Sequence, residues 1–116
     1  MAEIIIYEKP TCTKCRMANT FLKNLGLKFT KINYYEKPLT EKKLQALIKK
    51  MGVPAGKLLR TKEPIYRDLK LAKKDLSDKE LVKLMIKYPD LLQRPIVEKG
   101  DKAVLGRPTE NLQALV

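Results

Sequence analysis

The sequence predicts one α/β domain, residues 1–116, with a mixed four-stranded sheet. A β-branched run, an amphipathic segment and a second β-branched run follow one another within the first 33 residues, in the order of a βαβ unit. Two short apolar runs separated by Gly100-Asp101 predict an antiparallel hairpin near the end of the sequence. The stretch between these parts has helical periodicity, so we expect the order βαβ, a helical insertion at about residues 38–90, and ββα.

The βαβ unit begins with Glu3–Tyr7 (EIIIY), a β-branched and aromatic run before a Pro-Thr break, which predicts a buried strand. Apolar residues recur at helical spacing in Cys15–Leu25, and Gly26 suits the left-handed conformation that ends many helices. Lys28–Asn33 (KFTKIN) predicts the second strand. Because a helix connects the two strands, we expect them to be parallel.

The helical insertion contains two clear helix starts. Thr40 is a good N-cap for a helix that closes at Met51–Pro54. Ser77–Glu80 has the pattern of a capping box ahead of a second helix, which ends near Tyr88-Pro89. Between them, Ala55–Leu76 is less periodic and predicts one or two short helices separated by turns.

The C-terminal part predicts the remaining two strands and a last helix. Ile96–Glu98 and Ala103–Leu105 flank the tight turn, and Thr109 caps a helix that carries Leu112 and Leu115. The sequence contains no internal repeat, low-complexity segment or linker. We therefore expect a single domain.

The composition is that of a soluble protein with a basic surface. The net charge is +12, but 20 of the 25 basic residues are lysines spread along the predicted helices, without interleaved aromatic residues. This pattern favours a solvated surface over an anionic partner, and nucleic acid is not the expected ligand. No apolar run is long enough to span a bilayer, and the start MAEIIIYEKP does not resemble a secretory signal, so we expect a cytoplasmic protein without a membrane segment.

The only two cysteines, Cys12 and Cys15, form a C-x-x-C motif directly after the first predicted strand. Cys12 is expected at or just before a helix N-terminus, where the helix dipole lowers the pKa of a thiol and favours the reactive thiolate. Lys9, Lys14 and Arg16 add positive charge nearby. Cys15, about one turn further on, could resolve a mixed disulfide at Cys12. The placement indicates a thioredoxin-like redox site.

Two other interpretations of the cysteine pair are less favoured. A structural zinc ion usually takes four cysteine or histidine ligands, and this sequence has two cysteines and no histidine, so we expect no metal. An inert pair of small residues at a helix start remains an alternative. Without an imidazole, activation of Cys12 would have to come from the helix end and from cations. Glu8 lies close in sequence, and we expect it to face solvent.

Three of the five arginines lie at predicted loops or element ends, where functional groups concentrate: Arg60, Arg94 and Arg107. A guanidinium offers paired donors that match a tetrahedral oxyanion. A thiolate beside arginines would suit an anionic electrophile. Each arginine could instead cap a helix or pair with a surface carboxylate, and the sequence alone leaves this open.

Four segments together resemble a known family. They are the Cys12 motif after the first strand, LLRT around Arg60, LLQRPIVEKG, and AVLGRPTENL. In their order and spacing, over nearly the whole sequence, they resemble the glutaredoxin-linked arsenate reductases and their relatives. The resemblance implies a thioredoxin-like α/β fold with a helical insertion.

The resemblance also implies roles for individual residues. Cys12 would be the nucleophile that attacks arsenate and forms a thiol–arsenic adduct. The oxyanion would be held by Arg60, Arg94 and Arg107. Pro95 would be the cis-proline that precedes the third strand. Glutathione and glutaredoxin would supply the electrons, glutathione as a co-substrate, with no bound cofactor.

Two departures from the family's pattern keep a second interpretation open. Many of these enzymes have a histidine a few residues before the nucleophile, where this sequence has Glu8, and many have serine where Cys15 stands. A C-x-x-C pair is typical of the Spx-type regulators, which bind RNA polymerase and would here be switched by a Cys12–Cys15 disulfide. The three arginines and LGRPTENL favour the reductase. A general protein thiol-disulfide oxidoreductase is a third alternative.

Overall fold

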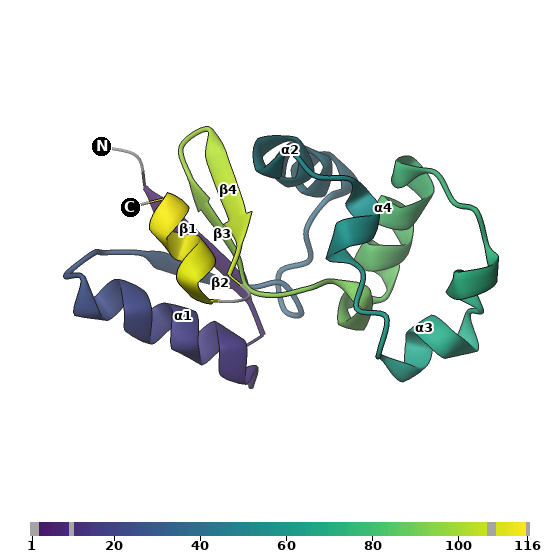
Figure 1. Ribbon diagram of the computed structural model, residues 1–116, viewed down its shortest axis with the longest axis horizontal. Helices are drawn as coiled ribbons and strands as arrows, with labels where there is room; N and C mark the ends of the chain where they lie inside the picture. Colours follow the sequence, from purple (N-terminus) through teal and green to yellow (C-terminus); the bar gives the residue numbers. More distant parts are fainter. Residues whose placement is uncertain (1–2, 10, 107–108, 116) are drawn as a thin grey trace. The chain divides into compact units, whose positions relative to one another are not determined.

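The structure is a computed structural model that describes residues 3–9, 11–106 and 109–115 (Figure 1). The chain divides into two compact units. The first comprises Met1–Pro38 and Arg94–Val116, and the second is Leu39–Gln93. The second unit covers the segment where the sequence predicts a helical insertion.

The first unit contains a four-stranded mixed sheet with strand order β2-β1-β3-β4. Strand β1 pairs parallel with β2 and antiparallel with β3, and β3 pairs antiparallel with β4. The predicted βαβ and ββ parts are therefore confirmed. The elements of this unit, with η denoting a 3-10 helix, are β1 (Ile4–Glu8), α1 (Thr13–Asn24), β2 (Thr30–Asn33), β3 (Ile96–Lys99), β4 (Lys102–Leu105) and η4 (Thr109–Ala114).

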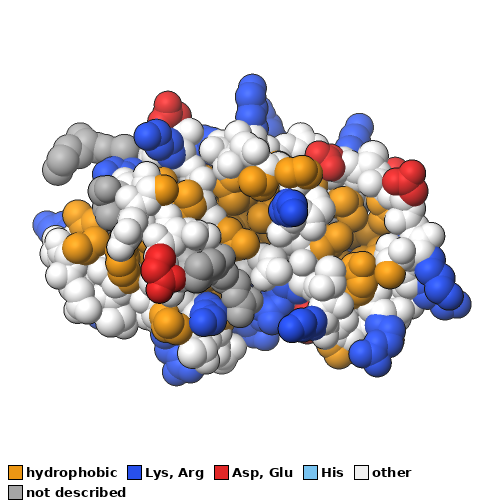
Figure 2. Space-filling view, viewed as in Figure 1, with side chains coloured by type: hydrophobic (Ala, Val, Ile, Leu, Met, Phe, Trp, Pro, Cys, Tyr) orange, Lys and Arg blue, Asp and Glu red, His pale blue; other side chains and the backbone are white. Residues whose placement is uncertain are grey.

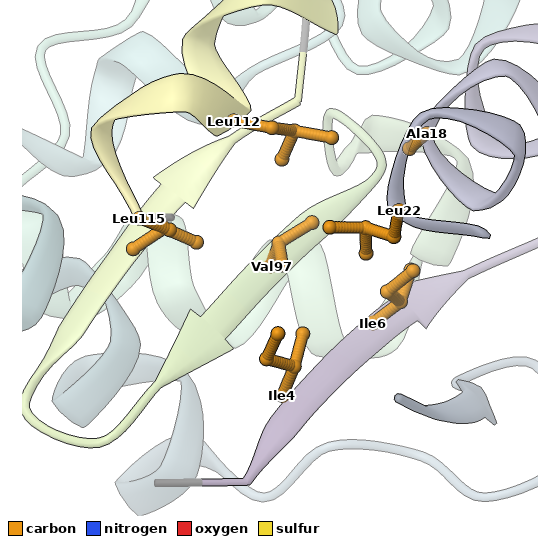
Figure 3. Packing of buried hydrophobic residues seen from close by; sticks show 7 residues of the cluster. All are labelled: Ile4, Ile6, Ala18, Leu22, Val97, Leu112 and Leu115. Carbon is orange, nitrogen blue, oxygen red and sulfur yellow. The ribbon is translucent and has the colours of Figure 1, made fainter. Parts of the chain in front are cut away.

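The core of the first unit lies on one face of the sheet (Figure 3). Because side chains alternate along a strand, Ile4 and Ile6 of β1 point to the same face, and Val97 pairs with Ile6 in register. Side chains of α1, of η4 and of the residue after η4 cover them, namely Ala18, Leu22, Leu112 and Leu115. Full burial of one aliphatic side chain of this size contributes about 1.5–3 kcal/mol.

The ends of α1 follow from its sequence with one difference. The helix begins at Thr13 rather than at Cys15, because the Cys12 side chain caps the first turn by accepting from the backbone N–H of Cys15. At the other end Gly26 has φ +72°, the left-handed conformation expected of it. Strand β1 also extends one residue further than predicted, to Glu8, which pairs with Asn33 of β2.

The second unit is helical, and both predicted helix caps are present. The Thr40 hydroxyl oxygen accepts from the backbone N–H of Lys43 at 3.0 Å, and Ser77 and Glu80 form a capping box. The less periodic stretch contains short helices, as predicted. The elements are α2 (Glu41–Met51), η1 (Ala55–Leu58), α3 (Pro64–Asp68), η2 (Leu71–Lys73), α4 (Asp78–Lys87) and η3 (Pro89–Leu91).

The chain has 25 basic and 13 acidic residues, and on the face drawn in Figure 2 many of the lysine and arginine side chains stand apart from one another. Among the described residues, none of the helices is both long enough and apolar enough to cross a membrane.

Candidate functional site

The candidate nucleophile Cys12 lies in the loop that connects β1 to α1. Its backbone is extended, with φ −81° and ψ 123°, and its Sγ accepts from the backbone N–H of Cys15 at 3.4 Å. The loop is held by two backbone bonds, from Cys12 N to Lys9 O at 2.9 Å and from Arg16 N to Cys12 O at 3.1 Å. The sulfur therefore lies at the positive end of a 12-residue helix, as the sequence predicts.

The second cysteine, Cys15, is fully buried in the first turn of α1, and both cysteines are free thiols. Burial and hydrogen bonding with the Cys12 side chain, assisted by the negative charge of Cys12 and of Glu8, raise the pKa of Cys15 to about 12, although a backbone bond with Lys9 acts in the opposite direction. Cys15 is therefore a protonated donor at neutral pH.

The balance at Cys12 favours the thiolate. Partial burial of Cys12 opposes ionisation, but the hydrogen bonds from the Cys15 side chain and backbone, and then the hydrogen bond and charge of Arg94, together hold the pKa of Cys12 below its usual value. Cys12 thus tends towards the thiolate, and Cys15 towards the protonated thiol. Thiolate character is what makes a cysteine reactive.

Arg94 is the guanidinium that the structure brings to Cys12. The side chain is buried, with 6% of its surface exposed, at the residue before β3, and the Arg94–Pro95 peptide bond is cis, the form that the resemblance implies for Pro95. Arg94 Nη1 donates to the hydroxyl oxygens of Tyr34 at 3.5 Å and Tyr35 at 3.3 Å. Its Nε is buried without a hydrogen-bond partner among the described residues.

The tyrosines around Arg94 were not predicted as site residues. The guanidinium carbon lies 5.9 Å from the centre of the Tyr35 ring, and Lys9 Nζ lies 4.9 Å from the same ring. Burial works against a charged Arg94, but the interactions with Tyr34, Tyr35 and Cys12 raise its pKa above the usual value. The available signal was the position of Tyr34-Tyr35 directly after β2, since ligands bind at the carboxyl ends of parallel strands.

The expectation that Glu8 faces solvent is wrong. Only 4% of Glu8 is exposed, and its carboxylate accepts from Asn19 Nδ2 of α1 at 3.1 Å. The reason is that β1 extends to Glu8, which places its side chain on the same face as Ile4 and Ile6, where α1 covers the sheet. Its charge is one of the causes that keep Cys15 protonated.

The predictions for the other two arginines concern other parts of the chain. Arg60 lies in the second unit, where its Nη2 is 2.9 Å from Glu63 Oε1, the surface ion pair that the sequence left open as an alternative. Arg107 lies outside the described residues. Of the predicted set, the structure brings together Cys12, Cys15 and Arg94, with Pro95 following Arg94 in sequence.

This arrangement suits nucleophilic attack on an anion. It combines a thiolate-favouring sulfur, a helix N-terminus, and a buried guanidinium with a spare donor. Across the ranges 3–9, 11–106 and 109–115, no three acidic, histidine or cysteine side chains gather in a way that could hold a metal ion.

Comparison with known proteins gives concordant matches over the full length. The model of the ArsC family matches residues 7–115. An arsenate reductase of Haemophilus influenzae is 38% identical over 110 residues, covering 94% of this chain and 95% of that protein. An arsenate reductase of Neisseria meningitidis serogroup A is 32% identical over 117 residues, covering all of both chains. The solved structure of an arsenate reductase from Vibrio cholerae superposes with a TM-score of 0.93 at 32% identity, covering 99% of this chain and 98% of that one.

Proposed function

The chain belongs to the ArsC family, and on that premise we propose that it is a thiol-dependent enzyme that reduces arsenate to arsenite through Cys12. The observation that carries the proposal is the grouping of Cys12, Cys15 and Arg94, in which the Cys15 backbone N–H donates to Cys12 Sγ and the buried Arg94 helps to lower the pKa of Cys12. The proteins of similar sequence over the full length that are named arsenate reductases support the choice of substrate.

The first step is attack on arsenic by the Cys12 thiolate. A sulfur–arsenic bond forms, one arsenic–oxygen bond breaks, and that oxygen takes up protons and leaves as water. Over the complete reaction two thiols lose one electron each as they join in a disulfide, and arsenic gains both electrons and passes from As(V) to As(III). The protein therefore has to hold the oxyanion close to the sulfur and supply an ionised thiol.

Arg94 would hold the oxyanion. A fixed, buried guanidinium stabilises negative charge more strongly than an exposed one, because less water screens it. Its Nε lacks a partner among the described residues and is a donor that an arsenate oxygen could occupy. By the family resemblance Arg60 and Arg107 would complete the oxyanion site.

The reductant in this proposal is glutathione, with glutaredoxin as the protein that completes the electron transfer. The low thiolate character of Cys15 supports an external thiol, since the attacking form in thiol–disulfide exchange is the thiolate. Glutathione is a cytosolic thiol, and the two free thiols suit the cytoplasm.

The test is arsenite formation by the purified protein with glutathione and glutaredoxin. We expect turnover by the wild type, none by Cys12→Ser, and activity retained in Cys15→Ser, since an external thiol replaces it. Thr20→Ser, on the exposed face of α1, is the matched control for a hydroxyl variant. An inactive wild type, or a fully active Cys12→Ser protein, would contradict the proposal.

A second candidate is a redox-switched regulator that binds RNA polymerase. The observation that favours it is that Cys15 lies three residues after Cys12 in the first turn of α1, where its backbone N–H donates to Cys12 Sγ at 3.4 Å and each thiol shifts the pKa of the other. The test is co-purification of polymerase with oxidised and reduced protein. Recovery of polymerase in only one redox state would favour the regulator, and absence in both would exclude it.

A further inference from the structure

The buried guanidinium of Arg94 is surrounded by acceptors of an unusual kind. Its Nη1 donates to two phenol oxygens, from Tyr34 and Tyr35, and its charge helps to lower the pKa of Cys12. Arg60, by contrast, is paired with the carboxylate of Glu63. The two buried carboxylates of the same unit have other partners: Glu8 accepts from Asn19, and Glu98 accepts from the Tyr7 hydroxyl.

The kind of acceptor matters because a phenol is neutral, whereas a carboxylate is negatively charged. A carboxylate would orient a guanidinium but would also cancel its charge, and so weaken its attraction for a thiolate and for an oxyanion. Two hydroxyl acceptors orient Nη1 and leave the positive charge intact. The face of the Tyr35 ring also attracts the cation without neutralising it.

The tyrosines are themselves held in place by the backbone around them. Tyr34 N–H donates to Glu8 O at 3.4 Å, which ties it to the end of β1, four residues before Cys12. Tyr35 N–H donates to the Asn33 side-chain oxygen at 3.0 Å. The two rings also contact each other, with centres 5.1 Å apart. The pair is therefore a fixed support rather than a mobile surface group.

We propose that Tyr34 and Tyr35 are positioning residues that hold Arg94 against Cys12 and leave its Nε for the substrate oxyanion. The part that concerns the substrate rests on the proposed function, whereas the part that concerns Cys12 does not. The tyrosines act through Arg94 and do not touch the reacting atoms. A supporting shell of this kind orients the groups that carry the chemistry.

The test uses Tyr35→Phe, which removes the hydroxyl and keeps the ring, and Tyr34→Phe. Tyr88→Phe is the matched control, because Tyr88 lies in the second unit with its ring next to Lys87 Nζ at 5.4 Å. The first readout is the rate of alkylation of Cys12 against pH, which needs no arsenate. We expect the inflection to move to higher pH in both site variants and to stay unchanged in Tyr88→Phe.

The second readout is a double-mutant cycle with Arg94→Lys. If the tyrosines act through Arg94, then Tyr35→Phe shifts the inflection in the wild-type background but adds no shift in the Arg94→Lys background. With arsenate as substrate, we expect kcat/KM of Tyr35→Phe to fall by up to about a hundredfold, because a misplacement of about 1 Å in the site can cost that much. Tyr35→Leu tests the contribution of the ring, because it removes the ring as well as the hydroxyl. It should lower kcat/KM more than Tyr35→Phe does.

Two results would overturn the inference. One is an unchanged inflection in Tyr35→Phe, and the other is an equal shift in both backgrounds of the cycle. Tyr34 is buried, so circular dichroism is used to check that Tyr34→Phe folds. If it does not fold, the result for Tyr35→Phe, at a half-buried position, decides alone. A wild type that reduces no arsenate would refute the proposed function, while the alkylation profiles would still judge the support of Arg94.

Discussion

Gly106 precedes the segment 107–108 and packs directly against Pro95, the residue after Arg94. A Cβ added at Gly106 would lie 2.9 Å from Pro95 Cγ and 3.5 Å from Leu112 Cδ2. The backbone cannot easily retreat, because Gly106 N–H donates to Pro95 O at 2.8 Å. Gly106→Ala therefore forces the Pro95 ring, strand β4 or helix η4 to move.

The expected cost of this overpacking is about 1–3 kcal/mol in the free energy of unfolding. With an unfolding entropy of about 2.1 cal/mol/K per residue and 116 residues, a loss of about 2 kcal/mol lowers Tm by roughly 8 °C. Gly56→Ala is the control, since its nearest neighbour to an added Cβ, Leu81 Cδ1, is 4.0 Å away. We expect Gly56→Ala to be neutral or stabilising by up to about 1 kcal/mol.

The assay is thermal and urea unfolding of both variants, with the alkylation rate of Cys12 as a second measurement. Because Pro95 follows Arg94, a displaced Pro95 ring should also disturb the Arg94 guanidinium. Cys12 of Gly106→Ala should therefore be alkylated more slowly at neutral pH than Cys12 of the wild type. A Gly106→Ala protein as stable as Gly56→Ala would refute the packing argument.

Three further predictions concern burial and capping. The pKa of Cys15 in the folded protein, about 12, lies above that of an unfolded thiol, so the stability that Cys15 contributes is complete below the unfolded pKa and is lost as pH rises towards 12. In Cys15→Ala the free energy of unfolding should therefore decline less steeply with rising pH than in the wild type. Asn19→Ala removes the donor to buried Glu8 and should cost about 1.5–3 kcal/mol in urea unfolding, whereas exposed Asn24→Ala should cost far less. Ser77→Ala removes a capping box and should lower unfolding free energy by about 1 kcal/mol, and an unchanged midpoint would contradict the cap's contribution.

The parts of the fold that the sequence predicts are those with local causes. The β-branched run of β1, the caps at Thr40 and Ser77, and the left-handed Gly26 each depend on a few neighbouring residues. Cys12 at the start of α1 was predictable for the same reason. The ion pair of Arg60 is also local, because Glu63 lies only three residues further along the sequence, in RTKE.

The remaining features depend on distant parts of the chain. Glu8 is buried because pairing with β2 extends β1 by one residue, and because Asn19 donates to its carboxylate. No local sequence pattern indicates either contact. Tyr34 and Tyr35 contact Arg94 across 60 and 59 residues of sequence. Their meeting follows from the strand order, which places β1 between β2 and β3. Such contacts appear only when the sheet is assembled.

The most direct measurement of the central claim is the rate of Cys12 alkylation against pH, with glutathione as the reference thiol and with and without arsenate. We expect an inflection for Cys12 below that of glutathione, no reaction of buried Cys15 over the same range, and protection of Cys12 by arsenate. Arg94→Lys should move the inflection upward, and exposed Arg67→Lys should not. A Cys12 that titrates like glutathione and is not protected by arsenate would contradict the account.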